Sequence, residues 1–340
     1  MVRLLQICLL IPMLMLVACE GNSRLPQYEL SGNAMGTTFS VLLVAPGEDF
    51  SKEQLQSNIL ETLEAVDRLA STWREDSELS RLNANRSSEW IDTSIELCTA
   101  IERALEISRL TDGAFDITVG PLVNLWGFGP DGDVSEPPAD SALLAVMAEV
   151  GYERLKTHCD TPAVQKQNGN IYVDLSGWAK GHAVDRLAAL LDEKKLKDYL
   201  VEIGGELRVR GHNAEGLKWA VAIESPSTTK RVPHSVLRVT NTSVATSGDY
   251  RNFFDHEGQH YSHTIDPRTG RPISHALAAV TVVNESAAYA DALATALLVL
   301  GPTEGPERAK NLGVAAYFLI RDNTGIMEVS TPIFDLLGAS

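Results

Sequence analysis

Apolar residues recur at helical spacing in several stretches of the chain, and polar or Gly-rich sequence separates these stretches. Between Ser51 and Leu69 they would fall on one face of a helix, which predicts an amphipathic helix there. A second amphipathic helix is predicted from Ser94 to Leu110, and an almost wholly apolar one from Ser286 to Leu300. Shorter helices are predicted at 141–150 and 182–191.

Runs rich in β-branched and aromatic residues predict strands between these helices. Two such runs flank Gly204-Gly205, which predicts a hairpin with a two-residue turn. The stretch from Tyr28 to Val44 predicts two strands that break at 32–36. Further strands are predicted at 171–175, 219–224, 235–239 and 278–283. Strands and helices are thus both predicted along the chain, and no internal repeat is present.

The composition indicates a globular protein and argues against a nucleic-acid-binding one. The chain has 340 residues, 44% of them hydrophobic, which is enough for a substantial core. Its formal net charge is −16 and no basic stripe is present, so nucleic acid is not expected as a partner.

The N-terminus predicts a targeting segment. Arg3 precedes an apolar run from Leu4 to Val17 that has the length of a signal-peptide core. This run ends in Leu16-Val17-Ala18-Cys19, which resembles a bacterial lipobox, the site where a Cys becomes the lipid-bearing (palmitate) first residue. We therefore expect a signal peptide at 1–18, a tether at 19–27 and one domain at 28–340. The alternative is an ordinary signal peptide that happens to contain Cys19.

Lipidation at Cys19 would anchor the protein to the bacterial cell membrane with its body facing the periplasm. Loss of residues 1–18 removes Arg3 and changes the net charge from −16 to −17. Cys98 and Cys159 would remain, and outside the cytoplasm they could form a disulfide. The sequence leaves their pairing open.

The chain from Thr246 to Pro272 is unusually rich in chemically active side chains. Short strands are predicted at 251–254 and 260–265, with turns at 255–259 and 266–270. A hairpin followed by a tight turn would hold His263 in a rigid array. The segment His256-Glu257-Gly258-Gln259-His260 also matches the zinc pattern H-E-x-x-H, but that pattern requires a helix. Because Gly258 and strand-like flanks predict a hairpin, we do not expect a metal here.

Two other features indicate phosphate and metal chemistry. Asp291 and Thr295 are spaced to share one face of the apolar helix, and a carboxylate with a hydroxyl suits Mg²⁺. The alternative is a buried Asp that bonds a neighbouring turn. Residues 176–181 predict a small-residue loop before a helix, a setting that favours anions, and Lys180 would add a positive charge.

Together these motifs resemble the ApbE-type flavin transferase family, the FAD:protein FMN transferases. They occur in the family's order and extend over roughly residues 30–300. The matching segments are Ala34–Thr37, Asp112–Pro121, Val173–Gly181, Glu202–Glu206, Thr246–Tyr250, His263–Pro267 with Thr269-Gly270, and Ala290–Ala296.

The resemblance implies an α/β (α+β) fold, a single unit with mixed, largely antiparallel sheets and flanking helices. It implies Mg²⁺-dependent transfer of FMN from FAD to a Thr or Ser hydroxyl of an acceptor protein, through a phosphoester bond, with release of AMP. The acceptor would be an extracytoplasmic redox protein, such as a subunit of a membrane redox pump. A metal-dependent FAD pyrophosphatase that gives FMN and AMP is one alternative, and a non-catalytic flavin-binding lipoprotein is another.

The resemblance also implies roles for individual residues. His263 and Asp291 would be catalytic, and Ala179, through its carbonyl, would join Asp291 and Thr295 as metal ligands. The chain departs from the family at Trp178 and His182, where Ile and Tyr are common. The implied FAD contacts are Met35, Trp73, Asp116, Lys180, His182, Ser247 and Ile265.

Overall fold

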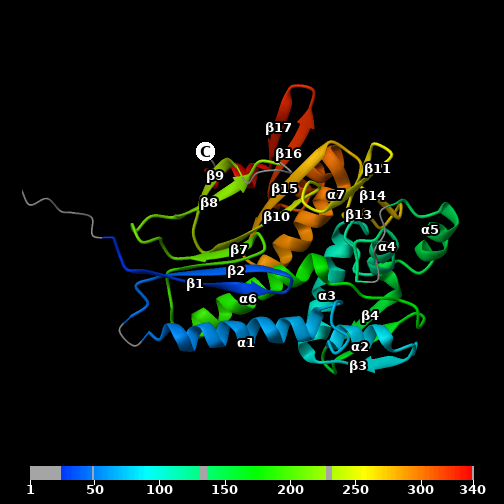
Figure 1. Ribbon diagram of the computed structural model, residues 1–340, viewed down its shortest axis with the longest axis horizontal. Coiled ribbons are helices and arrows are strands. Elements are labelled where there is room, and N and C mark those ends of the chain that lie inside the picture. The colour runs from blue at the N-terminus through cyan, green and yellow to red at the C-terminus, as the bar shows by residue number, and fades with distance from the viewer. Residues whose placement is uncertain (1–23, 48–49, 131–135, 227–231, 339–340) are drawn as a thin grey trace, which may run out of the picture.

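An antiparallel sheet of eight strands forms the centre of the computed structural model, which describes residues 24–47, 50–130, 136–226 and 232–338 (Figure 1). Cys19 and the predicted signal peptide lie outside the described residues. The sheet confirms the predicted fold class, including the Gly204-Gly205 hairpin. In spatial order the strands are β1 (Gln27–Ala34), β2 (Thr37–Val44), β6 (Tyr199–Ile203), β7 (Glu206–Arg210), β10 (Thr242–Gly248), β15 (Leu277–Asn284), β16 (Ala315–Asp322) and β17 (Gly325–Ser330).

Both faces of this sheet are covered. Helices α1 (Lys52–Ala70), α6 (Ser176–Glu193) and α7 (Ala287–Asn311) pack on one face, and the hairpin of β8 (Trp219–Glu224) and β9 (Pro233–Val239) contributes to the core on the other. Burial alternates along the strands as the strand period requires. On β10, for example, Ala245 packs in the helix-side core and Val244 in the core with the β8–β9 hairpin.

A second region packs beside the sheet and flanks the site described below (Figure 1). A disulfide joins Cys98 on α3 to Cys159, and this settles the pairing that the sequence left open. The elements of this region are α2 (Glu78–Ala84), β3 (Trp90–Asp92), α3 (Ile95–Leu110), α4 (Gly120–Leu125), α5 (Asp140–Met147), the 3-10 turn Tyr152–Arg154, β4 (Leu155–His158) and β5 (Ala163–Lys166). At the C-terminus, α8 (Pro332–Asp335) follows β17.

The three main predicted helices are confirmed, and a serine caps each of them. Ser51, Ser94 and Ser286 accept hydrogen bonds from backbone N–H groups in the first turns of α1, α3 and α7. α7 extends beyond the predicted end at Leu300 through a kink at Gly301, whose φ is 80°. Among the described residues, no helix has both the length and the apolar character needed to cross a membrane.

Two predicted elements are wrong. The extended segment 171–175 belongs to no sheet, because its backbone groups bond elsewhere: Val173 exchanges two hydrogen bonds with the side chain of Asn83, and Asp174 N donates to Ile117 O. The helix predicted to begin at His182 begins at Ser176. Lys180 therefore lies within the first turns of α6 rather than in a loop before it.

The predicted hairpin is present, with shifted ends. It consists of β11 (Phe253–His256) and β12 (Gln259–Ser262), and the following tight turn joins β13 (Ile265–Asp266) to β14 (Arg271–Pro272). His256 is paired with Gln259, whereas His260 is paired with Asp255. Since adjacent strand residues point to opposite faces, the two His of the H-E-x-x-H match point away from each other.

Candidate active site

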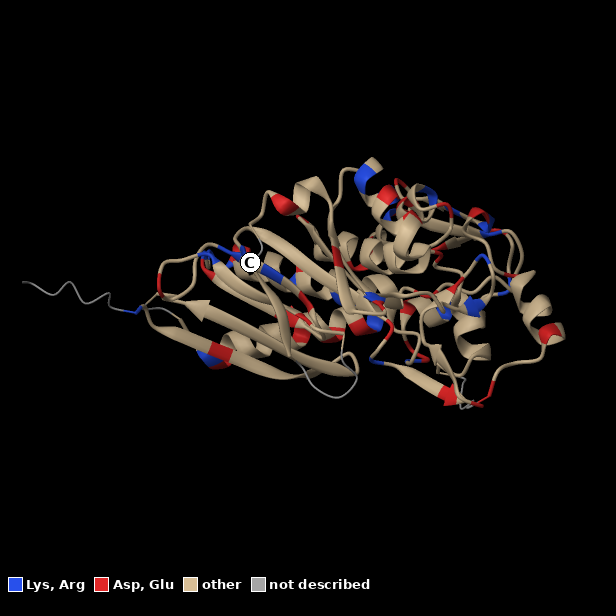
Figure 2. Cartoon of the chain, turned by 90° about the horizontal axis from the view of Figure 1, so that it is seen from above, with Lys and Arg blue, Asp and Glu red and all other residues tan. Residues whose placement is uncertain are grey.

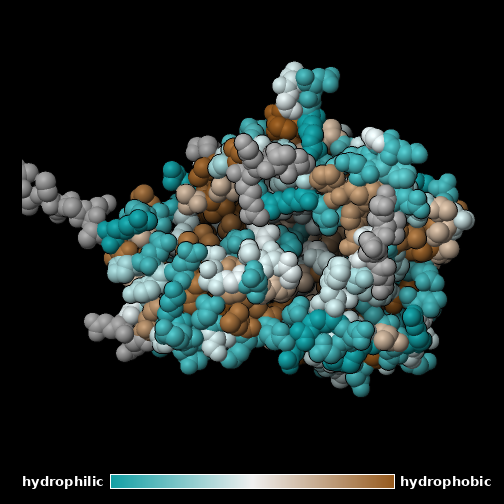
Figure 3. Space-filling view, in the orientation of Figure 1, coloured by the Kyte–Doolittle hydropathy of each residue, from teal (hydrophilic) through white to brown (hydrophobic). Residues whose placement is uncertain are grey.

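A cavity of about 1130 Å³ lies where the sheet, α6, α7 and the second region meet, and the molecule is hollowed there (Figure 3). Small-molecule pockets commonly measure about 300–1,000 Å³, so this one fits a large ligand. Most of the predicted site residues line it, although they come from distant parts of the chain. They are Met35, Trp73, Asp116, Ala179, Lys180, Ser247, His263, Ile265, Asp291 and Thr295.

Close packing of α6 against α7 brings two of these segments together. A Cβ at Gly181 would lie 2.3 Å from the carbonyl oxygen of Ala287, so only a glycine allows the helices this approach. On the next turn of α6, Asp185 accepts hydrogen bonds from the side chain of Ser286 and from two N–H groups at the start of α7. These contacts place Asp291 beside the first turns of α6, where its Oδ2 accepts a hydrogen bond from Gly181 N at 3.2 Å.

Asp291 and Thr295 present oxygen atoms to the cavity from α7. Asp291 is only 3% exposed, and burial raises the pKa of its carboxyl, although the Lys180 charge opposes that shift. The hydroxyl of Thr295 lies 3.0 Å from that of Ser247 on β10. A carboxylate and hydroxyls without a Cys or His ligand form a donor set that fits Mg²⁺.

Within the described residues, no three His, Cys, Asp or Glu side chains converge as a metal-binding group. A cation at Asp291 would therefore keep water or phosphate oxygens among its ligands, as Mg²⁺ usually does. Ala179, the third implied ligand, lines the same cavity from the first turn of α6.

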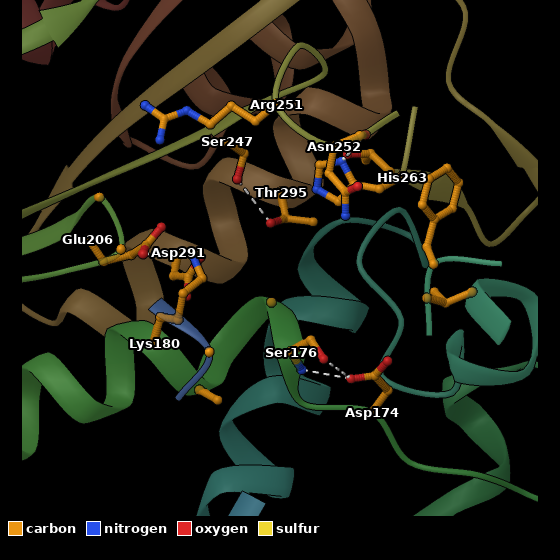
Figure 4. Close-up of a pocket in the computed structure, with 18 of the residues that line it drawn as sticks. Asp174, Ser176, Lys180, Glu206, Ser247, Arg251, Asn252, His263, Asp291 and Thr295 are labelled. Carbon is orange, nitrogen blue, oxygen red and sulfur yellow. Dashed lines mark hydrogen bonds and ion pairs between the residues drawn. The ribbon is translucent and has the colours of Figure 1, made fainter. Parts of the chain in front are cut away.

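Lys180 forms an ion pair with Glu206, at 2.6 Å, on the wall beside Asp291 (Figure 4). Burial disfavours the charged lysine, but the carboxylates of Asp291 and Glu206 outweigh that cost and raise its pKa. Burial raises the pKa of Glu206 to about 7, against the attraction of Lys180. Lys180 is thus held as a cation at the cavity.

His263 lies across the cavity, with Thr295 between it and the Lys180 wall (Figure 4). Its Nδ1 is 3.0 Å from the carbonyl oxygen of Asn252, and its backbone N donates to the same oxygen at 2.9 Å. The ring of Phe128 meets the imidazole edge-on, with centroids 6.3 Å apart. Burial lowers the pKa of His263, and the Lys180 charge lowers it further.

Three other predicted FAD contacts, Trp73, Met35 and Asp116, line the cavity with different degrees of exposure and different partners. Trp73 is 69% exposed at the rim of the cavity. Met35 occupies the β1–β2 turn with a φ of 52°. Asp116 is buried, and its carboxylate accepts hydrogen bonds from Thr118 N, Thr118 Oγ1 and Tyr152 N at 2.6–2.9 Å. Burial raises the pKa of Asp116, and these bonds oppose the shift.

His182 is not among the residues that line the cavity. Its Nε2 lies 3.4 Å from Glu96 of α3, and Arg186 on the next turn of α6 pairs with the same carboxylate at 3.0 Å. In this structure His182 therefore links α6 to α3 instead of facing the ligand space.

The cavity is also lined by polar residues that were not predicted as site residues, and these include Asp174, Glu206, Arg251 and Asn252. Asp174 and Glu206 lie inside recognised motifs, so a signal for them was present. Asn252 acts through its backbone carbonyl, which side-chain chemistry does not indicate.

Comparisons with known proteins agree with this geometry. The sequence profile of the ApbE family matches residues 35–318, more than half of the chain. The chain belongs to the ApbE family. The match spans every residue that we assign to the ApbE-type cavity, from Met35 to Thr295.

Individual members of the ApbE family are similar over almost their whole length. The FAD:protein FMN transferase of Vibrio cholerae is 40% identical over 322 residues, 95% of each chain. The Haemophilus influenzae protein of the same name is 39% identical over 329 residues, 95% of this chain and 94% of the relative. Among solved structures, the flavin transferase ApbE from V. cholerae has a TM-score of 0.86 at 39% identity, covering 92% of this chain and 99% of that one.

Proposed function

We propose that this protein is a flavin transferase that moves FMN from FAD to a Thr or Ser hydroxyl of an acceptor protein. Its ApbE-family relatives named FAD:protein FMN transferases support the general activity. The observation that carries the proposal is the common cavity of Lys180, Asp291, Thr295 and His263. In this cavity, Lys180 and a cation held by Asp291 and Thr295 would bind the pyrophosphate of FAD. His263 would act as the base that takes the proton of the acceptor hydroxyl.

The proposed reaction is an in-line substitution at phosphorus. The acceptor oxygen bonds to the phosphorus of the FMN half, the pyrophosphate P–O bond breaks, and AMP leaves with that bridging oxygen. His263 Nε2 takes the proton of the acceptor hydroxyl. Lys180, held by Glu206, binds phosphate oxygens, and Ser247 and Ile265 contact the bound FAD.

Asp291, Thr295 and the carbonyl of Ala179 would hold Mg²⁺ in this cavity. The bound cation would supply charge neutralisation at the phosphates, which phosphoryl-type transfer requires. An acceptor bound at this cavity would have its hydroxyl held in line with the P–O bond, which would favour transfer over hydrolysis.

We also propose that Cys19 carries a lipid that anchors the protein to the cell membrane with its body in the periplasm. The lipobox-like segment Leu16–Cys19 supports this location. An acceptor in the same compartment, such as a subunit of a membrane redox pump, fits the anchored enzyme.

The test is a labelling reaction with FAD, Mg²⁺ and membrane proteins as candidate acceptors, read by in-gel flavin fluorescence and acceptor mass. We expect labelling and stoichiometric AMP from FAD, none from FMN, which lacks the pyrophosphate bond, and none with chelator. The His263→Ala variant should lose labelling. His256→Ala is the matched control, since it changes a histidine of the neighbouring hairpin that does not line the cavity. Labelling from FMN, or labelling without metal, would contradict the mechanism, and AMP release without labelling would favour the pyrophosphatase.

A further inference from the structure

At one end of the domain, the first described residues, Arg24 and Leu25, contact the rest of the fold. Leu25 N donates to Ala214 O at 2.9 Å, and Arg24 pairs with Glu215 at 2.9 Å. The loop after α6 lies next to the segment that contains Ala214 and Glu215, since Asp198 Oδ1 accepts a hydrogen bond from His212 N at 2.7 Å. We call the surface formed by 24–28, 194–198 and 212–218 the basal surface.

These contacts shorten the tether predicted at 19–27, because Arg24 and Leu25 are already attached to the domain. Only residues 19–23 remain between Cys19 and the basal surface. A chain reaches at most ~3.3–3.6 Å per residue, so five residues span no more than about 18 Å. A lipid on Cys19 would hold the basal surface within that distance of the bilayer.

The chemistry of the basal surface suits a bilayer interface. Leu25, Tyr28 and Leu217 are 46%, 40% and 58% exposed. Exposed lysines lie on the same segments, and the ion pairs between described residues include none of them: Lys194, Lys195, Lys197 and Lys218. Lys and Arg positions, with Asp and Glu positions among them, are visible at the end from which the N-terminal segment leaves (Figure 2).

Carboxylates are also present, but two of those nearby already have cationic partners. Glu215 pairs with Arg24, and Asp192 pairs with Arg210. Glu193 is exposed next to Lys194. Asp198 accepts a backbone hydrogen bond and has no cationic partner among the described residues. Four lysines therefore stand against two free carboxylates, Glu193 and Asp198, on the described part of this surface, in a protein whose overall charge is −16. Basic residues beside a membrane anchor bind anionic lipid headgroups.

We propose that the basal surface docks on the anionic phospholipid surface of the membrane that holds the anchor. This inference rests on the lipid at Cys19 proposed above. It also fixes the height of the active site, because β1 runs from the basal surface to the cavity residue Met35. Eight strand residues at ~3.3 Å each put the cavity no more than about 26 Å from the basal surface. The acceptor would have to present its hydroxyl near that height.

The experiment uses the full chain, processed in a bacterium, with an environment-sensitive fluorophore on Leu217→Cys. Leu144→Cys is the matched control: it is 69% exposed and lies on α5, at the other end of the molecule (Figure 1). Each labelled protein is reconstituted in vesicles that contain headgroup quenchers, with or without phosphatidylglycerol. The mass of the peptide containing Cys19 is measured in the same samples.

We expect quenching at position 217 to be at least about two-fold stronger than at 144 in phosphatidylglycerol vesicles, because charge attraction adds to the anchor. The double variant Lys194→Glu, Lys197→Glu should reduce quenching at 217 without changing flavin transfer, since neither residue lines the cavity. If Cys19 is acylated but quenching is equal at 217 and 144, the proposed docking of the basal surface is wrong, whereas the proposed lipid anchor is supported. An unmodified Cys19 would overturn both, while flavin transfer would be unaffected.

Discussion

The Nδ1 atom of His263 lies 3.0 Å from the backbone carbonyl oxygen of Asn252. A carbonyl oxygen only accepts hydrogen bonds, so Nδ1 of the neutral ring must carry the hydrogen. The other nitrogen, Nε2, then has a free lone pair. The protein backbone thus selects the tautomer in which His263 can act as a base.

The first prediction concerns pH. Burial and Lys180 lower the pKa of His263, so its neutral, basic form should persist below pH 6.5, the ordinary value. The acid limb of kcat/KM for flavin transfer should therefore fall below that pH. His263→Ala should slow transfer about 10²–10⁴-fold, as expected for loss of a general base, with FAD binding largely retained. An acid limb at or above pH 6.5 would show that another group controls the reaction.

A second prediction concerns the ring that holds His263. Phe128 contacts the imidazole edge and stacks on Phe254 of β11, with centroids 5.6 Å apart. Phe128→Leu should free the imidazole to rotate and lower kcat by about 10-fold, which corresponds to about 1.4 kcal/mol. The control is Phe334→Leu, which removes a stacked ring on Tyr317, remote from the cavity. If both variants lower kcat equally, a general loss of stability explains the effect.

Local signals account for the parts of the fold that the sequence predicted. Ser51, Ser94 and Ser286 cap the helices that they were expected to begin, because a hydroxyl at this position satisfies a free N–H of the first turn. The turn containing Gly204-Gly205 likewise needs positive φ values, 61° and 113°, that glycine adopts readily.

The errors arose where distant contacts decide the structure. The β-branched and aromatic residues at 171–175 indicated a strand, but Asn83 supplies hydrogen bonds that a neighbouring strand would have made. Gly177 and Gly181 indicated a loop, yet Gly181 lies inside α6 because α7 approaches it closely. His182 lies on the same helix with its Nε2 3.4 Å from Glu96, and its contact with FAD stays a prediction. The cavity residues were predicted by motifs, whereas the role of the Asn252 carbonyl required the folded chain.

The third prediction tests the disulfide. Cys98 and Cys159 are separated by 61 residues, and closing a loop of that size should contribute about 4 kcal/mol by limiting the unfolded chain. The Cys98→Ser, Cys159→Ser double variant should therefore unfold at lower denaturant concentration. Neither cysteine lines the cavity, so flavin transfer below the unfolding transition should be unchanged. An unchanged unfolding midpoint would show that the disulfide does not stabilise the native state.

The final prediction concerns Asp291, a carboxylate on an otherwise apolar stretch of helix. Its pKa is raised because burial penalises the charge, and Gly181 N and the Lys180 cation only partly compensate. A bound Mg²⁺ would complete that compensation and should stabilise the native state. At a Mg²⁺ concentration of 100 times Kd, linkage gives about 2.7 kcal/mol. Wild-type protein should therefore show a higher Tm with Mg²⁺ than with chelator.

Asp291→Asn keeps the shape of the side chain but removes the charge. We expect this variant to lose flavin transfer and the Tm increase with Mg²⁺, yet to be at least as stable as wild type in chelator, because an incompletely paired buried charge is costly. Asp116→Asn is the matched control, since Asp116 is also buried with a raised pKa but is held by three hydrogen bonds. That variant should lose stability and still respond to Mg²⁺. If Mg²⁺ raised the Tm of Asp291→Asn as much as that of wild type, the cation would bind elsewhere, and Asp291 would be only a buried group that joins α7 to α6.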